Sequence, residues 1–298
     1  MPLTEIFCEV DDFCKSFELY WRKRLIDTGQ VKRIKNSILT MSEIMTIIIF
    51  FHLSGYRTFK DYYIKYVSKY LRSDFPDIVS YNRFIELSQG VLIPLIIYLK
   101  TSRIGKATGI SFVDSAVIKA CNNRRIHSHK VFNGFAQRAK SSMGWFYGFK
   151  LHLLINDKGD ILSFAFTPGN VDDRNKDLMN RLTKHLFGKL FGDKGYLSKE
   201  LFVLLFEQGV QLITKLRKNM KNKLMPLMDK ILLRKRAIIE TINDQLKNIC
   251  QIEHTRHRSI LNFMVNSISA LIAYTYLPKR PSLNINTYND NKMLPVII

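Results

Sequence analysis

The sequence predicts an α/β protein in which a mixed sheet covered by helices follows an all-helical N-terminal region. Two observations lead to this fold class. The first hundred residues carry capped apolar helical segments, whereas from residue 110 onward the pattern changes to strands that later alternate with helices. The resulting order of elements, βββαβαβα, is typical of a mixed sheet with helices packed on it.

The N-terminal region is predicted to contain several short helices. Thr40 and Glu43 form a capping-box pattern at the start of an apolar segment, 44–53. Two further helical segments follow, at 58–71 and 80–99. Short capped helices of this kind occur in helix-turn-helix modules that bind DNA and in many other helical bundles, and the sequence leaves both alternatives open.

Strands begin with the apolar run 110–118, which is predicted to be a central strand. Residues 145–155 and 161–166 are predicted to form a hairpin, because Gly159 in the connecting turn suits a positive φ. Alternating elements follow the hairpin: helices at 173–186 and 198–208, strands at 189–191 and 210–216, and a basic helix around residue 240. This order matches the ribonuclease-H-like arrangement of a mixed sheet.

Residues 119–140 are polar and basic, and we expect an exposed loop or arm there. His127, His129 and His152 are candidate metal ligands by residue type, but no further Cys or His stands at a zinc-binding spacing. Contact with phosphate groups or simple solvation is the favoured interpretation of this segment. Its basic residues include Arg124, Arg125 and Lys130.

The four cysteines form no CxxC pair and no regular framework, which argues against a zinc site and against disulfide stapling. The N-terminus lacks the basic and apolar regions of a signal peptide. The longest apolar stretches, near 44–53 and 261–277, fall short of the roughly 18 clean apolar residues that a membrane span needs. We therefore expect a cytoplasmic protein that contacts no membrane.

The formal net charge of +21 indicates a polyanionic partner, most simply nucleic acid. A generally basic surface is the alternative. The distribution favours a partner, because residues 1–105 hold 15 Lys and Arg against 11 Asp and Glu, which leaves 31 against 14 in residues 106–298. The excess positive charge therefore lies in the predicted α/β part.

Three carboxylates, Asp114, Asp193 and Glu240, are the candidate catalytic residues. Asp114 interrupts an apolar strand, where an unpaired charge costs several kcal/mol, so a compensating cation is expected. Asp193 follows the short strand 189–191 beside glycines, and Glu240 lies on the basic helix. Carboxylates are the hard ligands that Mg²⁺ prefers. Two such ions, about 3.5–4 Å apart, suit the cutting and joining of phosphodiesters.

Arg236, Glu240 and Lys247 are spaced by four and seven residues, so they fall within about 40° of one another on a helix. This spacing places a candidate metal ligand between two cations suited to phosphates. An exposed helix laced with ion pairs is the alternative interpretation.

These blocks together resemble the DDE transposases of bacterial insertion sequences. The resemblance rests on Asp114 in its strand, on Gly192-Asp193-Lys-Gly-Tyr196 and on Arg236-x3-Glu240-x6-Lys247, with a Pro-Gly-Asn stretch within 167–173. It covers roughly residues 105–275. The family's third block reads Tyr-x2-Arg-x3-Glu-x6-Lys, and position 233, expected on the face of Glu240, is Leu233 instead of Tyr.

The resemblance implies a ribonuclease-H-like catalytic core that binds the terminal inverted repeats of its element, cleaves them and transfers the 3′ ends into target DNA. It implies that Asp114, Asp193 and Glu240 hold Mg²⁺ or Mn²⁺, expected as two ions, with Asp114 as the shared ligand. It further implies a bacterial protein associated with the nucleoid. It also implies a homo-oligomer, most simply a dimer, on double-stranded DNA. The expected DNA-binding residues are Arg236, Lys247, Arg124, Arg125, Lys130, Arg217 and Lys218.

We therefore expect a helical region at 1–105 that contacts DNA, a catalytic domain at 106–277 and a disordered tail, rich in Asn and Pro, at 278–298. Two other functions remain open. A structure-selective nuclease would keep the fold and the metal ions but would not join strands. A decayed copy would bind DNA without cleaving it, and Leu233 is consistent with that alternative.

Overall fold

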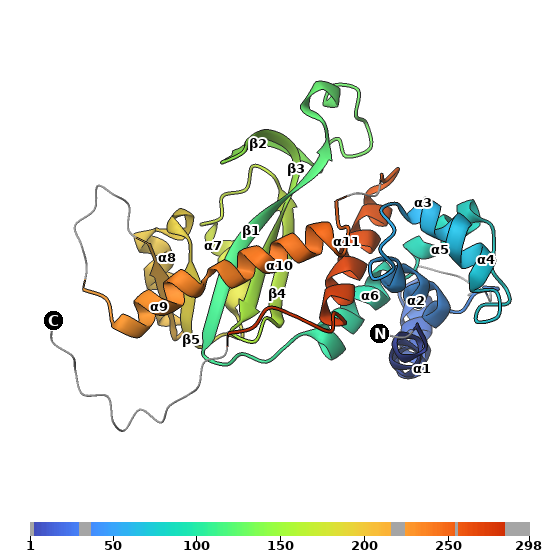
Figure 1. The fold of residues 1–298 in the computed structure, drawn as a ribbon, viewed down its shortest axis with the longest axis horizontal. Helices are drawn as coiled ribbons and strands as arrows, with labels where there is room; N and C mark the ends of the chain where they lie inside the picture. Colours follow the sequence, from blue (N-terminus) through green and yellow to red (C-terminus); the bar gives the residue numbers. More distant parts are fainter. Residues whose placement is uncertain (1–2, 30–36, 216–223, 254–255, 284–298) are drawn as a thin grey trace.

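The computed structural model describes residues 3–29, 37–215, 224–253 and 256–283. A central six-stranded sheet has helices on both of its faces, and a separate group of helices lies at one side of it (Figure 1). The N-terminal helices and the last helix together form this group (Figure 1).

The N-terminal region is helical, as predicted. Its elements are α1 (Leu3–Asp27), α2 (Met41–Phe51), α3 (Phe59–Tyr62), the π-helical turn η1 (Tyr63–Val67), α4 (Ser68–Tyr70), α5 (Tyr81–Gln89), α6 (Leu92–Tyr98) and the π-helical turn η2 (Leu99–Arg103). The capping box is confirmed, because the Thr40 hydroxyl accepts from the Glu43 amide and the Glu43 carboxylate accepts from the Thr40 amide. No pattern had singled out α1, whose buried residues are few and lie in its first half.

No single helix in the described ranges is long and apolar enough to cross a membrane. The pair Tyr81–Gln89 and Leu92–Arg103, which is bent by 61°, meets that test only when its two members are taken together, by length and composition.

The sheet has a ribonuclease-H-like topology, which confirms the predicted fold class. Its strands are β1 (Ile110–Cys121), β2 (Gln137–Ser141), β3 (Gly144–Asn156), β4 (Ile161–Pro168), β5 (Gly188–Gly192) and β6 (Val210–Thr214). Strand β3 pairs antiparallel with β1 and β4, whereas β5 pairs parallel with β1 and β6. Gly159 in the β3–β4 turn has φ 76°, as the hairpin pattern predicted.

Part of the predicted loop 119–140 is ordered as strand. Strand β1 continues to Cys121, and β2 pairs antiparallel with the first residues of β3. The prediction of a loop over 137–140 was therefore wrong. The physical reason is that β2, with the sequence QRAKS, is exposed and polar, so backbone pairing with β3 forms it without an apolar alternation that a sequence pattern could detect.

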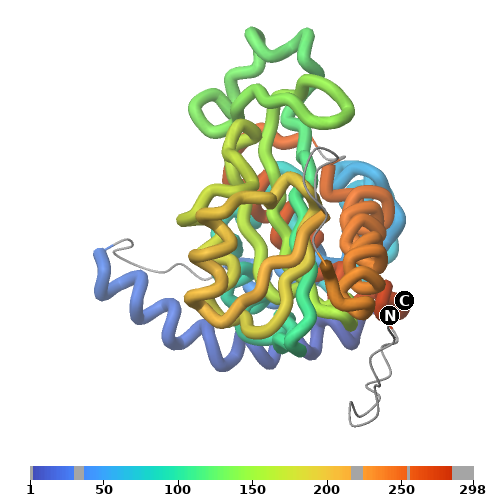
Figure 2. The backbone as a smooth tube through the Cα atoms, turned by 90° about the vertical axis from the view of Figure 1, so that its left-hand side faces the viewer, coloured from blue at the N-terminus to red at the C-terminus, as the bar shows by residue number. Residues whose placement is uncertain are grey.

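Helices cover the two faces of the sheet. On one face lie α7 (Lys176–Thr183) and α8 (Lys199–Glu207), capped by the side chains of Asn175 and Ser198. Helix α7 is shorter at both ends than the predicted 173–186. On the other face lie α9 (Leu227–Lys235) and α10 (Ala237–Asn248), which cross the sheet as one bent rod (Figures 1 and 2).

Helix α11 (Ile260–Thr275) connects the sheet with the N-terminal helices. Its Phe263 ring stacks on Phe149 of β3 at a centroid distance of 4.7 Å, and the same helix packs against α2, α5 and α6. One continuous apolar core therefore extends across the predicted boundary at residue 105. The assignment of DNA contact to one part and catalysis to the other stays a prediction.

The predicted tail begins with ordered residues. Arg280 pairs with Asp160 at 2.6 Å, and the Leu283 amide donates to the carbonyl oxygen of Asp157 at 2.7 Å. The expectation of disorder is therefore wrong for 278–283, which packs against the β3–β4 turn. Residues 284–298 lie outside the described ranges.

Candidate active site

Strand pairing brings the first two candidate carboxylates together. The parallel register of β1 and β5 matches Phe112 with Phe191. Two residues further along come Asp114, within β1, and Asp193, directly after the end of β5, and the charge of Asp193 acts on Asp114. The parallel pairing of β1 with β5 therefore brings together two carboxylates that lie far apart in sequence.

A tight turn holds the Asp193 side chain. Its Oδ1 accepts a hydrogen bond of 2.7 Å from the backbone amide of Gly195. A Cβ atom on residue 195 would lie 2.7 Å from the same oxygen, so only glycine allows this contact without a shift. The Gly-Asp-Lys-Gly sequence therefore fixes the direction of the Asp193 carboxylate.

Helix α10 supplies the third carboxylate and covers Asp114. The Arg236 guanidinium lies 3.6 Å from Asp114 Oδ1 and pairs with Glu240 one turn further along. Asn243 Nδ2 donates to Asp114 Oδ2 at 3.0 Å. Arg236 stands at the bend between α9 and α10, where the Ile239 amide donates to its carbonyl oxygen. The bend directs the guanidinium toward the sheet.

The electrostatics of Asp114 indicate a negative charge that Arg236 compensates only in part. Burial raises the pKa of its carboxyl from 3.8 to about 6, while the Arg236 guanidinium opposes that rise. The charges of Asp193 and Glu240 raise the pKa of Asp114 further, which shows that the three carboxylates share one electrostatic environment. A divalent cation suits this environment, because it would relieve both the burial cost and the mutual repulsion.

In the described part of the chain, no three His, Cys, Asp or Glu side chains approach closely enough to hold a metal ion. Arg236 explains part of this arrangement, because its guanidinium contacts both Asp114 and Glu240 and supplies the positive charge between them. The assignment of Asp114, Asp193 and Glu240 as metal ligands stays a prediction. It is consistent with their carboxylate donors and with the effect of Asp193 and Glu240 on the pKa of Asp114.

The predicted common face of the third block is formed only in part. Lys247 lies at the same sheet face as Arg236, but its Nζ donates to the Val117 carbonyl at 2.7 Å and lies 3.5 Å from a Glu253 carboxylate oxygen. Lys247 therefore also has a structural role. Leu233 is buried in the core while the Glu240 side chain is 56% exposed, so the expectation that position 233 shares the face of Glu240 is wrong. The bend at Arg236 causes this difference.

The other predicted DNA-binding residues lie away from the carboxylates. Arg124, Arg125 and Lys130 are exposed on the arm between β1 and β2, which extends beyond the sheet (Figure 1). Arg217 and Lys218 lie outside the described residues.

Two groups of site residues escaped the sequence prediction. Asn243 is one turn after Glu240 and two turns after Arg236, so the helical spacing that grouped those two would also have identified it. Opposite α10, Lys150 pairs with Asp173 at 3.0 Å, and Asp173 follows the Pro-Gly-Asn stretch. No spacing rule connects Lys150 with Asp173.

His152 is a structural residue in this second group. It is fully buried on β3, and its Nε2 lies 2.9 Å from the Thr167 hydroxyl. Burial lowers the pKa of His152 to about 4, so the imidazole is neutral near pH 7. The alternative in which His127, His129 and His152 bind a metal has no support among the described residues.

Replacing Arg236 with Ala is expected to raise the pKa of Asp114 by about one unit, because a neighbouring guanidinium lowers a carboxyl pKa by roughly that much or more. A carbon-13 NMR titration of the metal-free protein measures this pKa. Arg236→Lys, which keeps a cation, is the matched control and should show a smaller change. An unchanged pKa in Arg236→Ala would contradict the assigned role.

Comparisons with known proteins give two similarities. Residues 104–260 match the family model described as "Transposase DDE domain". Among solved structures, the cryo-EM structure of a piggyBac transposase synaptic complex with hairpin DNA matches 91% of this chain and 72% of its own, with 12% identity and a TM-score of 0.45. No curated protein matches the chain significantly. The family match includes Asp114, Asp193 and Glu240.

Proposed function

The chain belongs to the family of transposase DDE domains, whose model matches residues 104–260 of 298, and from this premise we propose that it moves an insertion sequence. It binds the terminal inverted repeats of that element, cleaves them and transfers the 3′ ends into target DNA. The observation that carries this proposal is the placement of Asp114, Asp193 and Glu240 in one electrostatic environment on a ribonuclease-H-like sheet.

In this proposal Asp114, Asp193 and Glu240 hold Mg²⁺ or Mn²⁺. When bound, such ions activate the attacking oxygen and stabilise the leaving oxygen of a phosphodiester. Asn243 orients Asp114 by donating to its Oδ2, and the Gly195 amide orients Asp193. Preformed hydrogen bonds to the ligands keep the carboxylates in place before substrate arrives.

Arg236 has two tasks in this proposal. Its guanidinium compensates the carboxylates while no metal ion is present, since it contacts both Asp114 and Glu240. With metal ions bound at the carboxylates, the guanidinium would be free for a DNA phosphate, which a guanidinium can bind through two parallel hydrogen bonds.

The DNA is bound mainly through its phosphates. Residues 106–298 carry 31 Lys and Arg against 14 Asp and Glu, and the exposed arm presents Arg124, Arg125 and Lys130. Each phosphate contact releases counterions, so binding of a terminal-repeat duplex should fall steeply between low and physiological salt. A binding constant that barely changes with salt would contradict this electrostatic interpretation.

Product mapping tests the proposed reaction. Labelled duplexes that carry the terminal repeat and a supercoiled target plasmid are incubated with the full chain and Mg²⁺. Repeat ends joined to the target support a transposase, whereas cuts without joined products support a structure-selective nuclease. Binding without any cut at every metal concentration supports a decayed copy. Inverted repeats flanking the reading frame identify the correct duplex.

The proposal includes a homodimer, because strand transfer uses two element ends that must be held together. The reaction requires both ends to be cut in one complex, and two copies of a single active site meet that requirement.

A further inference from the structure

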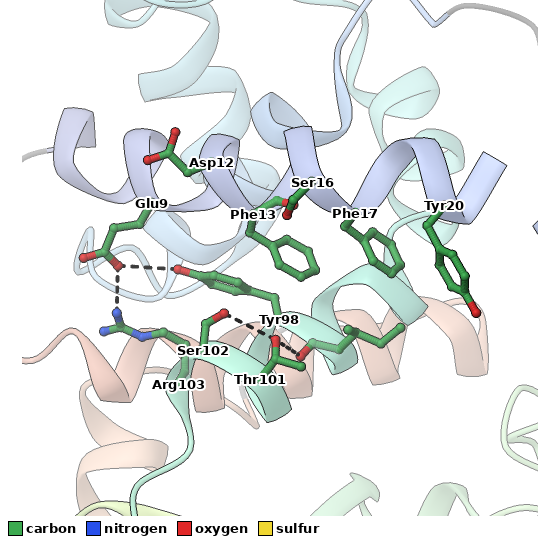
Figure 3. Close-up of a pocket in the computed structure, with 11 residues that line it drawn as sticks. Glu9, Asp12, Phe13, Ser16, Phe17, Tyr20, Tyr98, Thr101, Ser102 and Arg103 are labelled. Atoms are coloured by element: carbon green, nitrogen blue, oxygen red, sulfur yellow. Dashed lines mark hydrogen bonds and ion pairs between the residues drawn. The ribbon is translucent and has the colours of Figure 1, made fainter. Parts of the chain in front are cut away.

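A groove lies between the first helix and the last turns of the N-terminal region. It has a volume of about 790 Å³ and is walled by α1 on one side and by α6 and η2 on the other. Phe13, Phe17 and Tyr20 of α1 lie along it, opposite Ile97 and Tyr98 (Figure 3). The groove is therefore aromatic at its centre.

The second half of α1 contributes no buried residue to the hydrophobic core. All buried residues of this helix, Ile6, Val10 and Cys14, lie in its first half, and the rest of the helix projects from the protein (Figure 2). Aromatic rings nevertheless continue along the projecting half, with Phe13 on Phe17 at 5.1 Å and Phe17 on Trp21 at 5.6 Å. The Tyr20 side chain is 63% exposed. Phe13, Phe17 and Trp21 are half-buried, so the row is partly open to solvent, and such a row on a projecting helix is typical of an interaction surface.

Charges of opposite sign stand at the two ends of this row. We name as the α1 stripe the residues at helical spacing along the groove side of α1: Glu9, Asp12, Phe13, Ser16, Phe17, Tyr20, Lys23 and Arg24. Its first end is acidic, its centre aromatic and its second end basic. Among the residues that the structure describes, Asp12, Lys23 and Arg24 have no ion-pair partner.

This charge pattern is complementary to the same pattern on a second copy of α1 that runs in the opposite direction. If two copies of α1 lie antiparallel about a twofold axis close to Phe17, Asp12 of each copy faces Arg24 of the other, and the aromatic rings meet in the middle. A twofold interface requires this property, because the same patch must recognise itself. Complementary charges at both ends also fix the register of the two helices.

We propose that the α1 stripe is the homodimer interface of this protein and that its occupant is the α1 helix of a second copy, seated antiparallel in the groove. This inference specifies the surface for the dimer included in the proposed function. DNA does not fit the groove, because Glu9 and Asp12 would repel phosphates there.

The wall of the groove is preformed. The Glu9 carboxylate accepts a hydrogen bond of 2.7 Å from Arg103 of η2 (Figure 3) and another of 2.7 Å from the Tyr276 hydroxyl. The Arg103 guanidinium also lies 3.8 Å above the Tyr276 ring. These contacts anchor α1 to η2 and to the end of α11. The groove wall is therefore already ordered in the monomer, and binding of a partner helix loses little conformational entropy there.

Light scattering of the full chain, measured without DNA or metal over a range of protein concentrations, tests the interface. The wild-type protein is expected at twice the chain mass of 34.9 kDa. Asp12→Lys and Arg24→Glu should each weaken the dimer at least tenfold, because each places like charges opposite one another twice. The double variant Asp12→Lys/Arg24→Glu restores opposite charges and should restore the dimer.

Glu18→Gln is the matched control, because Glu18 lies on the side of α1 opposite the stripe, where it pairs with Arg22, and should not affect the mass. A monomeric wild-type protein, or dimers that survive both single substitutions, would overturn the proposed interface. Failure to rescue in the double variant, with unchanged helix content by circular dichroism, would overturn the antiparallel register. Strand-transfer assays of the same proteins report separately on the proposed function, since loss of joined products with an intact dimer counts against the reaction and not against the interface.

Discussion

Asp114→Asn is expected to abolish metal-dependent DNA cleavage and, at the same time, to stabilise the metal-free protein near neutral pH. Loss of a shared metal ligand removes several kcal/mol of transition-state stabilisation, which corresponds to a decrease of about 1,000-fold or more. The gain in stability arises because the ionised Asp114 carboxylate is held in a mostly buried position between like charges.

The pH dependence of this gain follows from the raised pKa. The pKa of Asp114 is about 6 in the folded protein, against 3.8 in the unfolded chain. Its contribution to stability is fully present below about pH 4 and is lost as the pH rises through about 6. Above pH 6 the ionised group therefore costs about 2–3 kcal/mol, since one pKa unit corresponds to about 1.4 kcal/mol. Asn avoids this cost.

Thermal unfolding between pH 3.5 and 7.5, with and without Mg²⁺, measures both effects. The difference between Asp114→Asn and the wild-type protein should be small at pH 4 and largest above pH 6. Mg²⁺ should stabilise the wild-type protein and leave the variant unchanged.

Asp172→Asn is the control with the opposite sign. The Arg174 side chain lowers the pKa of Asp172 to about 2, so this ionised carboxylate stabilises the protein at neutral pH. Its effect should be slight, because the side chain is exposed. A stability difference for Asp114→Asn that does not vary with pH, or cleavage at the normal rate, would contradict the role assigned to Asp114.

Phe263→Ala is expected to lower the free energy of unfolding by about 3–5 kcal/mol, because it removes a buried ring and leaves a cavity. The ring stacks on Phe149 and meets Phe132 edge-on at 5.4 Å, so it joins α11 to the sheet. The same helix packs against the N-terminal helices, and we therefore expect a single cooperative transition at a lower urea concentration.

Urea denaturation followed by tryptophan fluorescence and by circular dichroism measures this change. Leu261→Ala is the matched control on the same helix, because that side chain is 43% exposed, and it should cost less than about 1 kcal/mol. Two separate transitions in the wild-type protein, or equal losses in both variants, would contradict the view that α11 unites the sheet and the N-terminal helices.

Local signals in the sequence were sufficient where hydrogen bonding and periodicity act between near neighbours. The capping box of Thr40 and Glu43 marks the start of α2, and Gly159 marks the hairpin turn, because both depend on backbone groups within a few residues. Asp114 was identifiable as a candidate site residue because a charge inside an apolar strand requires compensation. These signals do not depend on how distant segments pack.

Strand β2 and helix α1 show where local signals fail. The exposed residues of β2 have no apolar alternation, and its existence depends on free backbone groups of β3. Helix α1 buries only three residues, and none of them lies in its second half. Strand β2 is held by backbone pairing with β3, and α1 packs on α2, so neither element depends on a side-chain pattern of its own.

The sequence by itself determined the fold class and the order of the strands and helices apart from α1 and β2, and it singled out the three candidate carboxylates. Only the tertiary structure decided that Arg236 stands between Asp114 and Glu240, that Asn243 holds Asp114, that Leu233 is a core residue, and that α11 joins the N-terminal helices. The physical reason is range: capping and periodicity act within a few residues, whereas the bend after α9 and the packing of α11 arise from contacts between segments whose relative placement no local pattern specifies.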